Sequence, residues 1–192
     1  MSPSAQDQTF LADYFERLRQ VNVLDADLVA AIAATRDMFA AAKQAGGKVA
    51  VIGNGGSAGI AAHIAIDLAK NGKVTAVCFN EAAQITCLAN DYGFENWLAH
   101  AVRMNLRSGD VLVAISSSGK SPNILNAVKA ARELGLKVVT LSGFLPDNPL
   151  RQTGDVNFWA DSRAYNIVET AHQFWLMSVI DLIIGKAEYS AN

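Results

Sequence analysis

The feature that most constrains the fold is a regular alternation of short apolar runs and amphipathic segments after residue 47. The apolar runs are KVAVIG (48–53), KVTAVCF (73–79), DVLVAIS (110–116), KVVTLSG (137–143) and DVNFWA (155–160). Strands that are apolar throughout and separated by helices indicate a parallel sheet covered on both faces. We expect helices at 57–70, 123–134 and 165–185, and a loop at 144–154. The pattern therefore predicts an α/β fold.

The first 46 residues are expected to form two helices. Apolar residues recur at helical spacing from Phe10 to Leu18, and Asp25 or Asp27 caps a second helix that ends at Gly46. Helices this apolar need a surface to cover them, and another subunit would supply it. We therefore divide the chain into N-terminal helices for oligomer packing (1–46) and a sheet domain (47–192), which together form one structural unit.

Composition excludes several classes of partner. The chain of 192 residues has a net charge of −2 at pH 7, and its Lys and Arg residues are scattered, so no basic stripe indicates direct nucleic-acid binding. No apolar run approaches the roughly 20 residues that span a bilayer, and the N-terminus does not read as a secretory signal. Cys78 and Cys87 are expected to be buried free thiols. A soluble cytoplasmic protein without a membrane partner is the expectation.

Two polar turns follow two of the predicted strands. The glycine turn (53–57, GNGGS) allows close backbone approach, and Asn54 and Ser57 add polar groups or a helix cap. It is neither GxGxxG nor a P-loop, so no nucleotide cofactor is expected. The serine turn (116–121, SSSGKS) presents four hydroxyls and a run of N–H groups at a helix N-terminus, which suits a phosphate dianion. The alternatives are an ordinary glycine-rich turn and a serine cap, although one serine would suffice for capping.

These turns, about 60 residues apart, resemble those of the SIS (sugar isomerase) family, in its phosphoheptose isomerase branch. The resemblance also covers GNGGSAGIAAHIAIDL (53–68), ITCLANDYGFEN (85–96), DVLVAISSSGKSPNI (110–124), KVVTLSG (137–143) and the final helix. It implies a five-stranded parallel sheet flanked by helices in a flavodoxin-like sandwich, and a homotetramer with active sites at subunit interfaces. It also implies aldose–ketose isomerisation of sedoheptulose 7-phosphate.

The resemblance assigns substrate contacts residue by residue. The phosphate is held by Ser116, Ser117, Ser118 and Ser121, and the sugar site is lined by Asn54, Gly55 and Gly56 with Ser57 nearby. Sugar hydroxyls are contacted by Asn90 and Asp91. Without the resemblance, residues 90–93 would simply form a good turn.

The isomerisation needs a base near C1 and C2, together with an acid or a metal that polarises the carbonyl. The family's histidine and glutamate on the helix after the glycine turn correspond to His63 and Asp67, which share a helix face at i, i+4. Asp67 is one methylene shorter than the family's glutamate. The alternative is an ordinary pair on a helix surface.

The last helix departs from the family pattern of a glutamine followed by two histidines. Alignment on the middle histidine gives Glu169, His172 and Met177, and methionine cannot transfer protons. Glu169 and His172 share a helix face at i, i+3, so with His63 and Asp67 they could bind zinc or another divalent ion. The alternative makes Glu169 and His172 a solvated or interface face.

Two classes of function remain open from the sequence. The first is a phosphosugar isomerase acting on sedoheptulose 7-phosphate or a similar sugar phosphate, with His63, Asp67 and Glu169 as catalytic candidates; in one version Glu169 takes over as base. The second is a non-catalytic phosphosugar sensor or a scaffold that binds the replication initiator, which Met177 favours.

Overall fold

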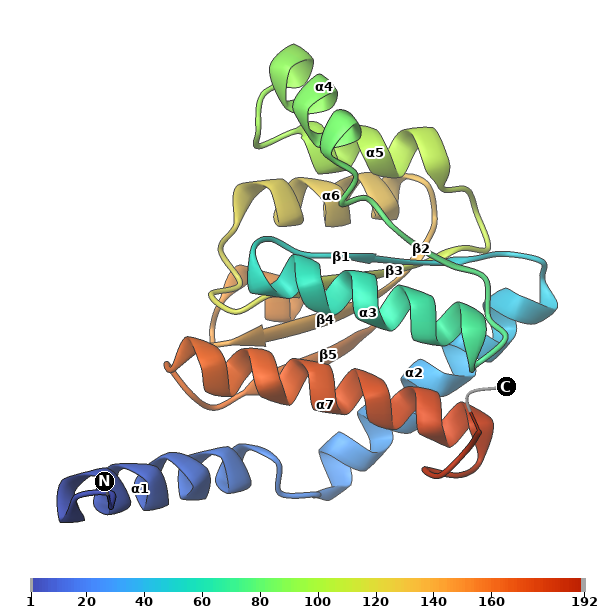
Figure 1. Cartoon of the computed structure of the whole chain (residues 1–192). Helices are drawn as coiled ribbons and strands as arrows, with labels where there is room; N and C mark the ends of the chain where they lie inside the picture. Colours follow the sequence, from blue (N-terminus) through green and yellow to red (C-terminus); the bar gives the residue numbers. More distant parts are fainter. Residues whose placement is uncertain (1, 191–192) are drawn as a thin grey trace.

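The computed structural model describes residues 2–190 and contains a five-stranded sheet in which neighbouring strands are parallel (Figure 1). This confirms the predicted fold class. The strands are β1 (Val49–Ile52), β2 (Ala76–Cys78), β3 (Val111–Ser116), β4 (Lys137–Gly143) and β5 (Val156–Ala160).

The strand order β2-β1-β3-β4-β5 places β1 beside β3. The chain leaves β1 for β2 on one side and returns to β3 on the other, so the helices after β1 and β3 lie on opposite faces. These are α3 (Gly56–Lys70) and α6 (Pro122–Glu133). In open α/β sheets a ligand crevice forms at the carboxyl ends of the two strands where the order reverses. The glycine turn follows β1 and the serine turn follows β3, so both lie at the position where such a crevice is expected.

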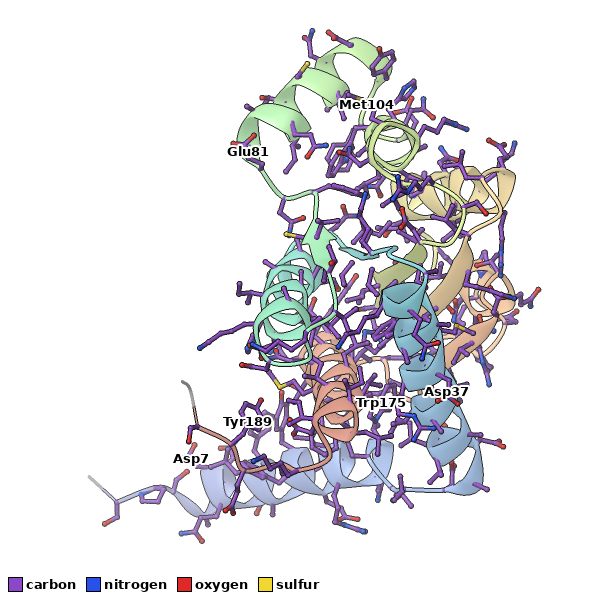
Figure 2. The ribbon with its side chains drawn as sticks, turned by 90° about the vertical axis from the view of Figure 1, so that its right-hand side faces the viewer. Asp7, Asp37, Glu81, Met104, Trp175 and Tyr189 are labelled. Atoms are coloured by element: carbon purple, nitrogen blue, oxygen red, sulfur yellow. The ribbon has the colours of Figure 1, made fainter. Side chains whose placement is uncertain are left out.

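Helices cover both faces of the sheet, and successive strand residues enter opposite cores. Ile115 packs on the face covered by α3 and α7, here called the first face, whereas Ala114 packs on the opposite, second face. Trp175 lies between α7 and α2 in the first core (Figure 2). The first face is covered by α2 (Ala26–Gln44), α3 and α7 (Tyr165–Ile184), and the second by α4 (Ala82–Tyr92), α5 (Trp97–Asn105), α6 and the short 3₁₀ helix η1 (Pro149–Gln152).

Helix α1 (Ala5–Val21) stands apart from the core. It begins with a capping box, in which Ser4 and Asp7 bond each other's backbone N–H groups. None of its described residues is buried, and Phe10 and Phe15 are 64% and 67% exposed. Helix α2 differs, because its Phe39 is fully buried against the sheet. The two N-terminal helices therefore have different roles in packing.

Some expectations need correction. Residues 90–92 form the last turn of α4, which Gly93 ends at a φ of 80°, rather than a free turn. Cys87 is exposed and Cys78 only partly buried, so the predicted burial of both thiols is wrong, although both are free. By length and composition α7 is apolar enough to cross a bilayer, contrary to expectation, but its buried face packs in the core as helices of globular proteins do.

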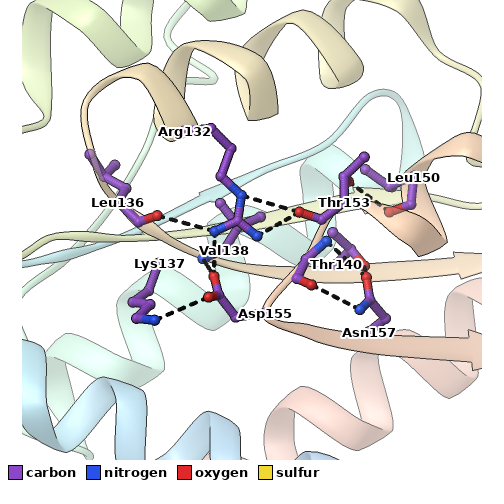
Figure 3. A network of polar contacts seen from close by, with 10 residues as sticks. Arg132, Leu136, Lys137, Val138, Thr140, Leu150, Thr153, Asp155 and Asn157 are labelled. Carbon is purple, nitrogen blue, oxygen red and sulfur yellow. Dashed lines mark hydrogen bonds and ion pairs between the residues drawn. The ribbon is translucent and has the colours of Figure 1, made fainter.

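A polar network joins the end of α6 to β4 and β5 (Figure 3). Asp155 accepts hydrogen bonds from Arg132 Nη1 at 2.6 Å, from Lys137 Nζ at 3.1 Å and from the Val138 backbone N–H at 2.8 Å. Arg132 also donates to the Thr153 carbonyl at 2.6 Å. Burial by itself raises the pKa of Asp155, but the bonds from Val138, Arg132 and Lys137 outweigh it and hold the pKa below its usual value. The network ties the helix that begins at the serine turn to the strands beneath it.

Candidate active site

The glycine and serine turns are joined side by side at the switch point of the sheet. Asn54 Nδ2 donates to Asn123 Oδ1 at 2.9 Å, and Asn123 Nδ2 donates to Asn54 Oδ1 at 2.8 Å. Asn123 lies in the first turn of α6, just after the serine turn, and is buried. The structure therefore brings together the two turns that the sequence places about 60 residues apart.

The hydroxyls of the serine turn are not used to cap α6. Ser121 is the N-cap residue, but its side chain makes no capping bond and instead lies 3.0 Å from Ser116 Oγ. Ser118 Oγ accepts from the Lys120 N–H at 3.3 Å. Ser117 Oγ is buried and has no hydrogen-bond partner among the described residues. This hydroxyl is therefore not committed to a protein partner and is available to a ligand bound at the turn.

The serine turn is held from below by the loop after β4. The N–H groups of Gly143 and Leu150 donate to the carbonyls of Ser117 and Gly119 at 2.9 and 3.1 Å. Asn148 is fully buried against Gly119, where a Cβ would overlap its side chain. Asn148 is not predicted as a site residue from the sequence, because its only local signal is its N-cap position before Pro149.

Glu169 faces the amino end of α3. Its carboxylate lies directly against Gly56, so closely that a methyl group on this glycine would overlap it. A negative charge at a helix N-terminus is favourable, because the N–H groups there are unpaired. Between α3 and α7 lies a groove of ≈390 Å³, and both Gly56 and Glu169 line it. Glu169 is thus the carboxylate that the fold places next to the glycine turn.

His63 and Asp67 contact each other as their spacing predicted, but they lie further along α3. His63 Nε2 is 3.2 Å from Asp67 Oδ2, and Asn71 Nδ2 donates to Asp67 Oδ1 at 3.2 Å. His63 Nδ1 lies 3.3 Å from Nε2 of Gln173, which the sequence analysis did not single out. At about 1.5 Å per residue, His63 is roughly 10 Å and Asp67 roughly 16 Å along the helix from Gly56.

His172 and Met177 face the core rather than the groove. His172 is fully buried, and its Nε2 lies 3.0 Å from the Ser142 carbonyl oxygen. Burial lowers the pKa of His172 to about 4, although the bond to Ser142 opposes the shift. Met177 is partly buried against the same core. The i, i+3 spacing leaves Glu169 and His172 about 60° apart around the helix, which is enough for one to face the groove and the other the sheet.

The four side chains proposed for a divalent metal therefore do not come together. His172 faces the sheet, and both ring nitrogens of His63 already have hydrogen-bond partners. Within residues 2–190 no group of three His, Cys, Asp or Glu side chains is placed to hold a metal ion. As arranged here, these residues do not fit zinc.

Asn90 and Asp91 lie away from the two turns. Both are exposed on α4, and Asn90 Nδ2 donates to Asp91 Oδ1 at 2.9 Å. Helix α4 stands at the top of Figure 1, beyond α5 and α6, whereas the carboxyl ends of β1 and β3 lie at the left. The structure does not bring this pair to the serine turn of the same chain.

The comparisons with known proteins agree with this geometry. The family model described as "SIS domain" matches residues 10–143. The phosphoheptose isomerase of Rhodospirillum rubrum is 39% identical over 138 residues, which are 69% of this chain and 70% of that enzyme. The phosphoheptose isomerase of Escherichia coli (strain K12 / DH10B) is 42% identical over 105 residues, which are 52% of this chain and only 55% of that enzyme.

Solved structures extend the likeness to nearly the whole chain. The phosphoheptose isomerase from Francisella tularensis superposes with a TM-score of 0.85 at 30% identity, over 96% of this chain and 100% of that one. The phosphoheptose isomerase from Neisseria gonorrhoeae gives a TM-score of 0.81 at 29% identity, over 92% and 98%.

Proposed function

The chain belongs to the SIS domain family, and on that premise we propose that it is a phosphosugar isomerase that interconverts sedoheptulose 7-phosphate, or a similar ketose phosphate, with its aldose. The relatives named above are phosphoheptose isomerases, which supports the catalytic hypothesis over a sensor or scaffold.

The observation that carries the proposal is the unpaired Ser117 hydroxyl inside the serine turn. The turn offers hydroxyls at the N-terminus of α6 that do not cap the helix. A phosphate dianion would accept from Ser117 and from neighbouring N–H groups, and the helix dipole would favour its charge. The sugar would then extend past the Asn54–Asn123 pair toward Gly56.

The chemistry requires one group that can take and return a carbon-bound proton. Glu169 is the proposed base, because it lines the groove beside Gly56 while Met177 cannot titrate. Its carboxylate takes a proton from the hydroxyl-bearing carbon next to the ketone, and the electrons of the broken C–H bond form the C=C bond of an enediolate whose negative charge lies on the former carbonyl oxygen. Glu169 then returns the proton to the former carbonyl carbon, while the hydroxyl proton moves to the other oxygen. No net oxidation occurs.

His63 and Asp67 have a different proposed role. Both ring nitrogens of His63 are hydrogen-bonded, and Asp67 accepts from His63 and Asn71. We therefore assign this pair to holding α3 in place against α7 rather than to proton transfer.

The test is an isomerase assay on sedoheptulose 7-phosphate with purified protein, run with and without added zinc. We expect turnover by the wild type. Glu169→Gln keeps the shape of the side chain and removes the base, so kcat should fall about 10²- to 10⁴-fold while KM changes little. Glu133→Gln, at an exposed carboxylate on α6, is the matched control. Ser117→Ala should mainly raise KM, because it removes a phosphate ligand.

Two outcomes would contradict parts of this proposal. Full activity in Glu169→Gln combined with loss of activity in Asp67→Asn would move the base to Asp67. No turnover by the wild type, although it binds the sugar phosphate, would refute the isomerase and favour a sensor, which Met177 would also explain.

Assembly and compartment are part of the proposal. We infer a homotetramer in the cytoplasm. The exposed apolar side chains of α1 support assembly, because such surfaces usually mark an interface. The two free cysteines support a reducing compartment.

A further inference from the structure

Gln173 is the second polar side chain by which α7 reaches α3. It lies four residues after Glu169, so the two share one helix face, and both line the groove between the helices. Glu169 meets Gly56 at the amino end of α3, while Gln173 meets His63 about two turns further along. Four residues on from Gln173, the same helix carries Met177, which cannot donate a hydrogen bond. Gln173 is therefore the polar side chain of this stripe that contacts His63.

The partners of His63 determine which of its nitrogens carries the proton. An ionised Asp67 is acceptor-only, so Nε2 of His63, 3.2 Å away, must carry a hydrogen to bond it. In a neutral imidazole this leaves Nδ1 without a hydrogen, as an acceptor. The group that faces Nδ1 must then be a donor, and the amide nitrogen of Gln173 is at 3.3 Å. The donors consequently run in one direction, from Gln173 to His63 to Asp67.

We propose that Gln173 is a positioning residue that holds His63 in the Nε2–H tautomer and thereby fixes α7 against α3. Its effect on catalysis rests on the proposed function, because the same helix contact keeps Glu169 over Gly56. The proposal also explains why His63 does not serve as a metal ligand in this arrangement: each ring nitrogen already has a partner. Gln173 does not touch the substrate in this account and acts through His63 and Glu169.

The tautomer can be measured without any assay of activity. The chain contains three histidines, so histidine-selective ¹⁵N labelling gives three imidazole spin systems, and His63→Asn identifies the one of interest. We expect wild-type His63 to show a protonated Nε2 and an unprotonated Nδ1. Gln173→Met keeps the length of the side chain and removes the donor, so either ring nitrogen can then face Asp67 and the two nitrogen shifts should move toward each other. Gln44→Met, at an exposed glutamine on α2, should leave the spectrum unchanged.

Steady-state kinetics of the same variant distinguish a positioning role of Gln173 from a general loss of folded structure. Gln173→Met should lower kcat about 10- to 100-fold, because small displacements of a catalytic group are costly, while KM for the sugar phosphate stays within about threefold, because the serine turn is untouched. Thermal melting checks that the variant is folded. An Nδ1–H tautomer in the wild type, or unchanged nitrogen shifts in Gln173→Met, would overturn the proposal. If the wild type shows no turnover, the proposed function fails and with it the kinetic part, whereas the nitrogen shifts still decide the tautomer.

Discussion

Single residues beneath the serine turn determine its shape. Gly119 has a φ of 64°, which is strained for other residues, and the space where its Cβ would lie is filled by the side chain of Asn148. Asn148 in turn donates to Ser142 Oγ at 3.1 Å and to the Leu145 carbonyl at 2.8 Å, so it cannot move aside without breaking buried bonds. The shape of the serine turn, the proposed phosphate site, thus depends on residues that lie outside the turn.

This arrangement gives a first prediction. Gly119→Ala should cost about 2–4 kcal/mol of unfolding free energy, from backbone strain plus overlap with Asn148, and should weaken sugar-phosphate binding at least about tenfold. Gly135→Ala is the control, because its φ of 73° is similar but nothing lies within 4 Å of the added methyl group. It should cost only about 1–2 kcal/mol and leave binding intact. Denaturant titration and calorimetric binding measure the two effects; equal losses in both variants would contradict the role of Asn148.

A second prediction concerns His172 and pH. Burial lowers its pKa from 6.5 to about 4, so the folded state resists a proton that the unfolded state accepts. The contribution of neutral His172 to the free energy of unfolding is therefore fully present above pH 6.5. It is lost progressively as the pH falls toward about 4, by an amount on the order of 3 kcal/mol. His172→Gln should flatten the dependence of unfolding free energy on pH over this interval. Parallel curves for the two proteins would refute the assignment.

At the scale of elements, the junction of α6 with β4 and β5 anchors the helix that begins at the serine turn. Asp155 accepts hydrogen bonds from the side chains of Arg132 and Lys137 and from the backbone N–H of Val138 in β4. The exposed pair Arg103–Glu133 also joins neighbouring helices, but without a backbone donor and with both side chains nearly half exposed. The two pairs test how much burial contributes to an ion pair.

The third prediction compares them directly. Asp155→Ala should lower the unfolding free energy by about 2–3 kcal/mol, since it leaves the Val138 N–H without its partner and removes the carboxylate partner of Arg132, which keeps its bond to the Thr153 carbonyl. Glu133→Ala should cost less than about 1 kcal/mol, because exposed ion pairs contribute little. Because the pKa of Asp155 lies below its usual value, its contribution is present above the unfolded-state pKa and is lost as the pH falls through the lower, folded-state value. Equal losses of unfolding free energy in the two variants at neutral pH would show that the Asp155 network stabilises the fold no more than an exposed ion pair does.

At the scale of the whole molecule, α1 is the element whose packing the single chain leaves incomplete. It presents Phe10, Leu11 and Phe15 to solvent, and it contributes no buried residue to the core described here. Met104 is equally exposed, at 70%, but lies at the opposite end of the molecule from α1 (Figure 2). Substitutions in α1 and at Met104 can therefore distinguish an assembly surface from an isolated exposed apolar side chain.

The fourth prediction follows from this contrast. The double variant Phe10→Glu/Phe15→Glu should lower the mass measured by light scattering from that of a tetramer to that of a smaller species, because it charges the apolar face of α1. Met104→Glu should leave the mass unchanged. Circular dichroism should show a folded chain in both cases. A monomeric wild type, or an unchanged mass in the double variant, would contradict assembly through α1.

The sequence by itself determined the α/β class, the five strands, the bounds of α3, α6 and α7 to within about a residue, and the two polar turns, whereas α4 and α5 were not predicted. It also placed His63 beside Asp67. These are local properties: strands and helices repeat every 2 and 3.6 residues, so spacing alone shows which side chains share a face. Only the tertiary structure decided that Gln173 meets His63, that Asn148 supports Gly119, and that His172 is buried while Glu169 faces the groove. Helix α7 is apolar around most of its circumference, so the face that turns inward depends on how it packs against α3 and the sheet, which spacing along one helix does not encode.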